Sequence, residues 1–237
     1  MIIFPAIDLF GGSAVRLFKG DYAQMTVYNP NPVEVALDFK KCGATHIHLV
    51  DLEGAKSGLT PNIDTIEKIA RECGLFVEVG GGIRNMETVE KYLAIGVDRV
   101  ILGTAAVTNP DFLVEAIKKH GEHIAVGVDI KDGYVAIRGW TEKSAYTFHE
   151  FCENMQKIGV STLICTDISR DGAMQGTNRS LYRELSEKYS VNIIASGGVS
   201  TIEDITELRA MDLYGAIIGK AYYTGAIDLA DAIEVAK

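Results

Sequence analysis

The chain of 237 residues is long enough for one large domain or two small ones, and its 47% hydrophobic and 23% charged residues are ordinary for a globular protein. Its formal net charge of -9 argues against nucleic-acid binding, which needs a dense basic face. No apolar run reaches the roughly 18 residues that span a bilayer, and the start, MIIFPAIDLF, lacks the basic segment of a secretory signal. We therefore expect a cytoplasmic protein that binds neither nucleic acid nor a membrane.

Short apolar, β-branched runs alternate with amphipathic stretches along the chain. The expected strands are Ile2–Ile7, His46–Val50, Phe76–Val79, Arg99–Leu102, His123–Val128, Thr162–Cys165, Asn192–Ala195 and Gly215–Ile218. The expected helices are Val33–Cys42, Ile63–Glu72, Met86–Ile95, Asp111–Lys119, Thr147–Ile158, Arg179–Tyr189, Ile202–Arg209 and Leu229–Val235. Strands that are apolar on both faces are typical of a parallel sheet covered by helices.

The chain also contains an internal repeat. Three of its signatures recur 116 positions further on: Gly81-Gly82-Ile83 as Gly197-Gly198-Val199, Leu102-Gly103 as Ile218-Gly219, and Asp51 as Asp167. Asp8 and Gly12 resemble Asp129 and Gly133 at a shift of 121. We predict one domain over residues 1–237, an α/β (βα)8 TIM barrel built from two duplicated (βα)4 halves. An open doubly wound sheet is the alternative, but Gly11-Gly12 matches its glycine-rich turn only weakly.

Glycine turns follow four of the expected strands, at the barrel edge where such enzymes hold their substrates. Gly197-Gly198 and Gly219-Lys220 follow strands seven and eight, the usual phosphate position. Glycine lets backbone N–H groups approach an anion without a Cβ in the way. The repeat places Gly81-Gly82 and Gly103-Thr104 half a barrel away, so we predict a small substrate with two phosphates.

Two aspartates end strands that face each other across an eight-stranded barrel: Asp8 on strand one and Asp129 on strand five. A ligand that bridges the two phosphate sites passes between them, and paired carboxylates suit proton removal at one face and proton delivery at another. Asp51 and Asp167 hold equivalent places on strands two and six and are rival candidates. The repeat does not say which aspartate is the acid and which is the base.

Other side chains in the loops after the strands could contact the substrate. Arg16, Arg84 and Arg138 could neutralise a phosphate or orient a carboxamide. Trp140, in the loop after strand five, could stack on a planar ring. Thr166 could hydrogen-bond a neighbouring carboxylate.

The histidines and cysteines are interpreted as structural. His46 and His48 alternate on strand two and point the same way. The four cysteines form no CxxC pair and are expected to be reduced thiols. None of the five histidines lies at ligand spacing from a cysteine, so we expect no metal.

Taken together, these motifs resemble a known family over essentially the whole chain. The chain is similar to the phosphoribosylformimino-5-aminoimidazole carboxamide ribotide isomerases of histidine biosynthesis in the segments FPAIDL, LFKGDY, HLVDLEGAKSG, VEVGGGIR, LGTAAV, GVDIKDGYVAIRGW, TDISRDGAMQGTN, SGGVS and IIGKAYY. The resemblance implies an Amadori rearrangement of an aminoaldose bisphosphate compound to its aminoketose, without metal or redox cofactor. It implies Asp8 as the proton acceptor and Asp129 as the proton donor.

The resemblance also implies where the substrate binds. The positions that match the family's phosphate-binding residues are Gly82, Gly103, Thr104, Gly172, Gly197, Gly198, Gly219 and Lys220. The predicted substrate-binding set is completed by Arg16, Arg84, Arg138, Trp140, Thr166 and Asp171.

Three other functions remain open. The sister cyclase, a lyase, shares the duplicated barrel and both aspartates, but it begins with an IPCLDV-like strand and pairs with a glutaminase. This chain has FPAIDL and a GWTEKS loop instead, and we expect no obligate protein partner. An isomerase could also accept phosphoribosylanthranilate, as some relatives do. A non-catalytic sugar-phosphate sensor should have lost an opposed acid or a phosphate glycine, and none is missing.

Overall fold

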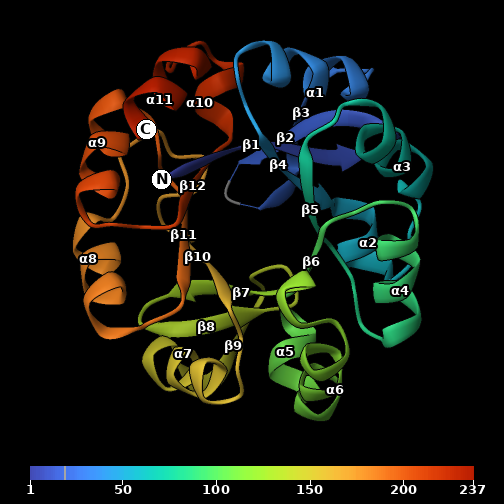
Figure 1. The fold of residues 1–237 in the computed structure, drawn as a ribbon, viewed down its shortest axis with the longest axis vertical. Coiled ribbons are helices and arrows are strands. Elements are labelled where there is room, and N and C mark those ends of the chain that lie inside the picture. Colours follow the sequence, from blue (N-terminus) through green and yellow to red (C-terminus); the bar gives the residue numbers. More distant parts are fainter. Residues whose placement is uncertain (19) are drawn as a thin grey trace.

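The structure is a computed structural model that describes residues 1–18 and 20–237. Eight parallel strands form its centre (Figure 1): β1 (Ile2–Phe10), β4 (His46–Asp51), β5 (Phe76–Gly80), β6 (Arg99–Leu102), β7 (Ile124–Lys131), β10 (Thr162–Asp167), β11 (Asn192–Ser196) and β12 (Gly215–Ile218). They follow the order β10-β11-β12-β1-β4-β5-β6-β7, and pairing of β10 with β7 closes the ring. The predicted (βα)8 barrel is confirmed. Lys19, in the segment LFKGDY, lies outside the described residues.

A ring of helices surrounds the strands, one main helix after each (Figure 1): α1 (Pro32–Lys41), α3 (Ile63–Glu72), α4 (Met86–Ala94), α6 (Pro110–His120), α7 (Phe148–Lys157), α8 (Arg179–Lys188), α9 (Ile202–Ala210) and α11 (Leu229–Ala236). Short helices α2 (Leu52–Ser57), α5 (Thr104–Thr108) and α10 (Lys220–Tyr223) follow three of the strands, and a 3-10 turn spans Gly121–His123. All the expected strands and helices are present, with their ends shifted by a few residues. Local chemistry accounts for one shift: Thr147 is not the first residue of α7 but its N-cap, in a capping box with Glu150.

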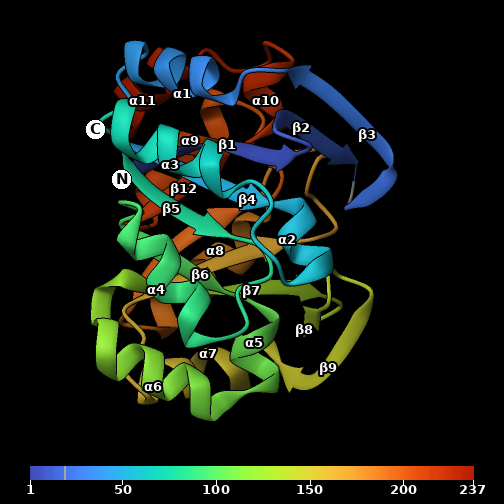
Figure 2. The ribbon, with the colours of Figure 1, turned by 90° about the vertical axis from the view of Figure 1, so that its right-hand side faces the viewer.

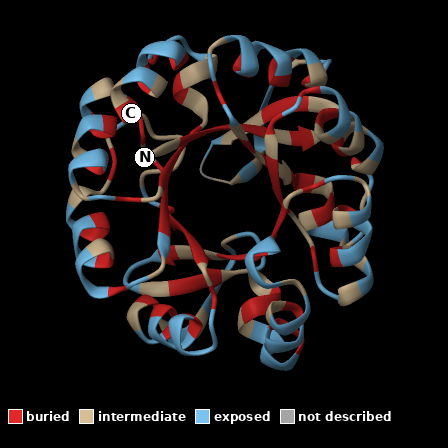
Figure 3. Cartoon of the chain, in the orientation of Figure 1, coloured by how far each residue is buried: buried red, intermediate tan, exposed pale blue. Residues whose placement is uncertain are grey.

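Apolar side chains fill both faces of the barrel wall, which explains the doubly apolar strands. The outward-facing side chains pack under the helices, whose outer sides stay exposed (Figure 3). The inward-facing ones form a separate cluster inside the barrel: Phe4, Ala6, Ile101, Ala125, Ile164, Ile194 and Ile217. The barrel interior is therefore a packed core, as is usual for this fold.

Two β-hairpins extend the barrel beyond β1 and β7. They are formed by β2 (Ser13–Phe18) with β3 (Asp21–Asn29), and by β8 (Tyr134–Ile137) with β9 (Glu142–Thr147). Figure 2 shows both at the carboxyl ends of the strands, on the same side as α2. The turn between β7 and β8 is Asp132-Gly133, whose φ angles of 50° and 79° suit a tight hairpin turn. This Asp-Gly pair was the sequence signal for a hairpin.

Candidate active site

The carboxyl ends of the barrel strands form one rim, called here the mouth. Asp8 on β1 and Asp129 on β7 lie four strands apart in the closed ring of eight, so they face each other across the mouth. Each is the next inward position after a small inner residue, Ala6 on β1 and Gly127 on β7. The strand periodicity thus brings the two predicted acids to opposite walls of one site.

Asp8 is held by a buried cation. Nη1 of Arg16, from β2, donates to Oδ2 of Asp8 at 3.0 Å, and Nη2 donates to the carbonyl of Ala6 at 2.9 Å. The hydroxyl of Tyr223 donates to the same carbonyl at 3.0 Å, and its ring lies 5.4 Å from the Arg16 guanidinium carbon. Burial lowers the pKa of Arg16, but Asp8, Tyr223 and Asp171 outweigh it and leave that pKa raised. The ion pair with Arg16 therefore holds the Asp8 side chain in place at the mouth.

Asp129 has the opposite surroundings. Burial raises the pKa of Asp129, and hydrogen bonds from Trp140 and Thr166, together with the charge of His48, offset that rise only in part. Thr166 is the in-register partner of Asp129 on β10. A carboxyl group with a raised pKa holds its proton more readily near neutral pH, which is what a proton donor needs.

A third carboxyl group, that of Asp171, interacts electrostatically with both aspartates. Burial raises the pKa of Asp171 to about 6, the charges of Asp8 and Asp129 add to the rise, and Arg16 opposes it. The loop that holds Asp171 is fastened to α10, because Nζ of Lys220 donates to the carbonyl of Gly172 at 3.0 Å. The predicted binding residues after β10 and β12 therefore meet beside the Asp8–Arg16 pair.

Asp51 and Asp167, the rival candidates, brace loops instead. Oδ1 of Asp51 accepts from the Gly54 N–H and from the Asn62 side chain, each at 2.8 Å. Oδ2 of Asp167 accepts from the Asn178 side chain at 2.6 Å, and its Oδ1 accepts twice from Ser169. Both aspartates are buried. Asn62 and Asn178 are also repeat partners, a signal in the sequence that could have identified these pairs as structural.

The structural reason for having glycine differs from one turn to the next. Gly82 and Gly198 both have positive φ, and a Cβ would lie 1.8 Å from the Gly54 carbonyl oxygen at the first and 2.4 Å from the Gly176 carbonyl oxygen at the second. Close packing of a neighbouring loop therefore accounts for these two glycines, whether or not an anion binds. Gly103 differs, since a Cβ there would meet no described atom within 4 Å. The Gly103-Thr104 turn is thus the one that leaves its backbone most open.

The remaining predicted arginines lie at the margin of the mouth. Nη2 of Arg84 donates to the carbonyls of Ala55 at 3.2 Å and Lys56 at 3.4 Å, at the end of α2. The Arg138 side chain is 63% exposed and pairs with Glu142 at 2.9 Å. Its backbone N–H donates to Oγ1 of Thr104 at 2.9 Å, which fastens the β8–β9 hairpin to the turn after β6.

Sequence reasoning missed a charged cluster inside the barrel. Glu78 and Arg99, buried and paired at 2.6 Å, lie on β5 and β6, and His48 on β4 bonds to Glu78 at 2.7 Å. The signal was a polar residue within each of three consecutive apolar strands. Two of the three are fully charged types, which seldom occur in a core unless paired.

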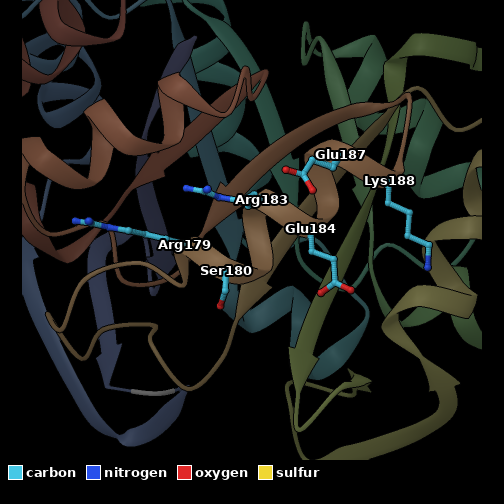
Figure 4. Close-up of a pocket in the computed structure, with 6 residues that line it drawn as sticks. All are labelled: Arg179, Ser180, Arg183, Glu184, Glu187 and Lys188. Carbon is cyan, nitrogen blue, oxygen red and sulfur yellow. The ribbon is translucent and has the colours of Figure 1, made fainter.

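Other surfaces carry less chemistry. The hollow in Figure 4 lies along the outer side of α8 and is lined by Arg179, Ser180, Arg183, Glu184, Glu187 and Lys188, away from the mouth.

Within residues 1–18 and 20–237, no three histidine, cysteine or carboxylate side chains gather so as to hold a metal ion. In the same part of the chain, no helix has the length and apolar character to cross a membrane.

Comparison with known proteins places the chain in a family. Residues 2–228 match the family described as histidine biosynthesis protein. A 1-(5-phosphoribosyl)-5-((5-phosphoribosylamino)methylideneamino) imidazole-4-carboxamide isomerase from Brachyspira hyodysenteriae is 52% identical over 237 residues, the full length of both chains. Isomerases of the same name from Lactococcus lactis and Ruminiclostridium cellulolyticum are 53% and 48% identical, over 97% and 98% of this chain and 97% and 99% of theirs. The chain belongs to the histidine biosynthesis protein family.

Proposed function

We propose that this protein is the isomerase of histidine biosynthesis that its relatives are named for, and that it converts the bisphosphorylated aminoaldose ribotide to its aminoketose isomer. The observation that carries the proposal is the pair of opposed aspartates in opposite electrostatic surroundings. Asp8 is ion-paired with Arg16, and the pKa of Asp129 is raised by burial. The identity of about half the residues to isomerases over their whole length supports the same reaction.

The two aspartates divide the proton transfers of an Amadori rearrangement. Asp129 protonates the ribose ring oxygen as the C1–O bond breaks, and the amine lone pair forms the C1=N bond of a Schiff base. Asp8 then removes the proton from C2, and the electrons of that C–H bond shift to give an enolamine. The enolamine gains a proton at C1 as its C2 hydroxyl becomes the ketone. A carboxylate paired with a cation suits the base, and a carboxyl group whose pKa is raised by burial suits the acid.

The phosphates of the substrate would occupy the two opposed groups of turns. We propose one phosphate at Gly197-Gly198 and Gly219-Lys220, and the other at Gly82 with Gly103-Thr104. The near-identical backbone angles of Gly103 (φ −98°, ψ −100°) and Gly219 (φ −104°, ψ −105°) support two equivalent sites. We also propose the cytoplasm as the place of the reaction, because a doubly phosphorylated substrate would be made and consumed there.

An assay of the purified protein tests this function. The aminoaldose substrate should be converted to the ketose, and Asp8→Asn should abolish turnover while the Kd for substrate stays within about threefold, since the carboxamide keeps the shape of the site. Ammonia and the ketose product should yield no imidazole, which a cyclase would form. Phosphoribosylanthranilate forms a further arm that reveals dual specificity. A protein that binds the aminoaldose without converting it would contradict the proposal and indicate a sensor.

A further inference from the structure

The turn between β1 and β2 is held by side chains from outside the hairpin. It consists of Gly11 and Gly12, whose φ angles of 56° and 73° suit a two-residue hairpin turn. Oε2 of Glu53 accepts from the Gly11 N–H at 2.7 Å, and Oδ1 of Asn62 accepts from the Gly12 N–H at 3.0 Å. Glu53 lies in α2 and Asn62 directly before α3. These two side chains are called here the turn clamp.

The turn clamp is itself joined to the barrel wall. Nδ2 of Asn62 donates to Oε2 of Glu53 at 3.1 Å and to Oδ1 of Asp51 at 2.8 Å. Asp51 is the buried last residue of β4, and Asn62 is only 3% exposed. Since β4 pairs with β1, the clamp connects the turn after β1 to the neighbouring strand of the barrel.

The repeat partner of Asn62 makes different contacts. Asn178, 116 positions further on, also donates to a buried aspartate, Asp167, at 2.6 Å. Its Oδ1, however, accepts from the Leu181 N–H at 3.2 Å and so caps the first turn of α8. The Oδ1 atom of Asn62 instead bonds to Gly12, which lies outside its own helix. The first half therefore uses a helix-capping position to hold a hairpin.

Glu53 departs from the repeat in the same way. The residue 116 positions after it is Ser169, whose N–H and hydroxyl both donate to Oδ1 of Asp167, at 2.9 and 2.6 Å. Ser169 thus bonds within its own loop, whereas Glu53 reaches the turn after β1. Both departures meet at the one turn that leads into β2 and Arg16.

The position of Arg16 depends on this turn because the β1–β2 hairpin is short. The paired stretch ends at Asp8 and Val15, so Arg16 lies one residue beyond it. From there its guanidinium group reaches back to Oδ2 of Asp8 at 3.0 Å and to the Ala6 carbonyl at 2.9 Å. The fit is close, because a Cβ on Gly219 would lie 2.6 Å from Nη2 of Arg16. A short two-stranded ribbon has little stability of its own, so contacts outside it decide where its residues lie.

We propose that the turn clamp positions Arg16 against Asp8, and so sets the geometry in which Asp8 removes the proton from the substrate. This inference rests on the proposed isomerase function, in which Asp8 is the base. Glu53 and Asn62 are positioning residues in this scheme, since they act through the hairpin and not on the reacting atoms.

Glu53→Ala is the first test, measured as kcat and KM. The half-buried side chain can be removed without opening the core, and a guanidinium group that is held less well should lower kcat about five- to twentyfold while KM stays within about twofold. Glu53→Gln keeps a side-chain oxygen that can accept from the Gly11 N–H. It should restore most of the lost kcat.

Asn62→Ala removes the other half of the turn clamp and should lower kcat at least as much. Asn109→Ala is the matched control, because Oδ1 of Asn109 caps α6 by accepting from the Phe112 N–H at 3.3 Å. Both variants lose an asparagine hydrogen bond and should have a lower Tm, but only Asn62→Ala should lose kcat. If Asn62→Ala does not fold, the Glu53 variants decide.

A double-mutant cycle separates positioning from a merely structural role. The Arg16→Met variant has no guanidinium group to position, so adding Glu53→Ala to it should lower kcat by less than about twofold. A brace that acts on the fold as a whole would cost the same factor with and without Arg16.

NMR spectra of the free protein test the same idea without turnover. The amide hydrogens of Gly11 and Gly12 should exchange with solvent faster in the clamp variants than in the wild type. Nη1 and Nη2 of Arg16 bond to different acceptors, so they should give separate signals in the wild type. In Glu53→Ala these signals should merge, because the guanidinium group turns more freely about its Nε–Cζ bond.

Two outcomes overturn the inference. One is a wild-type kcat for Glu53→Ala in an active isomerase, and the other is a full loss of kcat when Glu53→Ala is added to Arg16→Met. Absence of isomerase activity in the wild type would instead refute the proposed function. The guanidinium and amide signals would still report whether the turn clamp holds Arg16.

Discussion

The two halves of the barrel share a backbone plan but give their aspartates different partners. In the first half, Arg16 is only 15% exposed and lies 3.0 Å from Asp8. In the second half, Arg138, one residue beyond the position that the shift of 121 equates with Arg16, is 63% exposed and pairs with Glu142. Trp140 and Thr166 bond to Asp129 instead. The two aspartates of the duplicated barrel thus have different partners, a cation beside Asp8 and neutral hydrogen-bond donors beside Asp129.

The backbone of the β8–β9 hairpin explains why Asp129 has different partners from Asp8. Arg138, Gly139 and Trp140 have successive φ angles of 55°, 64° and 69°, a left-handed run between β8 and β9. That run directs the arginine outward and the indole toward Asp129. Arg16 instead lies within β2, where strand alternation points it at Asp8. Positive φ costs free energy at Arg138 and Trp140, so this turn is a strained feature placed at the site.

Replacing either aspartate with asparagine should have the largest effect on activity and should separate the two halves of the barrel most clearly. Asp8→Asn and Asp129→Asn should each lower kcat by about 100- to 10,000-fold. Their effects on folding should have opposite signs at pH 7.5. Asp8→Asn leaves the buried Arg16 cation without its counter-charge and should lower the Tm, whereas Asp129→Asn removes a carboxyl group whose ionisation is disfavoured in the fold and should raise it. Thermal unfolding followed by circular dichroism would show this, and Tm shifts of the same sign would contradict it.

Arg16 on β2 and Arg138 between β8 and β9 should differ by a large factor in their effect on kcat. Arg16→Met should reduce kcat about 100-fold, because the ion pair that favours the Asp8 carboxylate is lost. Arg138→Met removes an exposed pair with Glu142, and we expect its effect to fall on KM rather than kcat. Steady-state kinetics of both variants would measure the contrast. Equal losses of kcat would show that Arg138 moves onto the reacting groups when substrate binds.

The indole N–H should have a smaller effect. Trp140→Phe keeps the ring face but removes the hydrogen bond that lowers the pKa of Asp129. That pKa should rise, so the alkaline limb of the kcat profile should shift upward and kcat should fall about tenfold. Trp140→Tyr at the same position controls for ring size. An unchanged pH profile in the phenylalanine variant would rule out the hydrogen bond as a determinant of acidity.

Asp171 should have the smallest effect, measured on stability. Its pKa is raised to about 6 in the fold, so the fold disfavours its charge, and the cost grows as pH rises from about 4 to above 6. Asp171→Asn should therefore stabilise the protein by up to about 3 kcal/mol at pH 8 and by nothing measurable near pH 4. Urea unfolding at both pH values would test this, and a stabilisation independent of pH would contradict it.

Much of the fold was predictable because its signals are local. Apolar runs marked the eight barrel strands, and the repeat marked equivalent strand ends. The hairpins were missed, although Asp132-Gly133 marks the turn from β7 into β8, because their strands are half exposed and carry little apolar pattern. Asp51 and Asp167 could not be separated from Asp8 and Asp129 by position alone, since all four follow strands of the same sheet.

The asymmetry of the site depended on contacts between distant segments. Glu78, Arg99 and His48 come from three strands, and each is within reach of the next only because the strands are in register. The left-handed turn at Arg138 also has no clear signal in the residue types, because only glycine favours it. Neither feature follows from spacing along the chain.

The sequence by itself determined the barrel, its duplication and the presence of two opposed aspartates at the mouth, because strand periodicity and chain order dictate where such residues lie. The tertiary structure decided which aspartate is paired with a cation and which has its pKa raised by burial. That choice depends on burial and on charges only a few ångströms away, and these distances exist only once Arg16, Trp140 and His48 are folded against the two carboxyl groups.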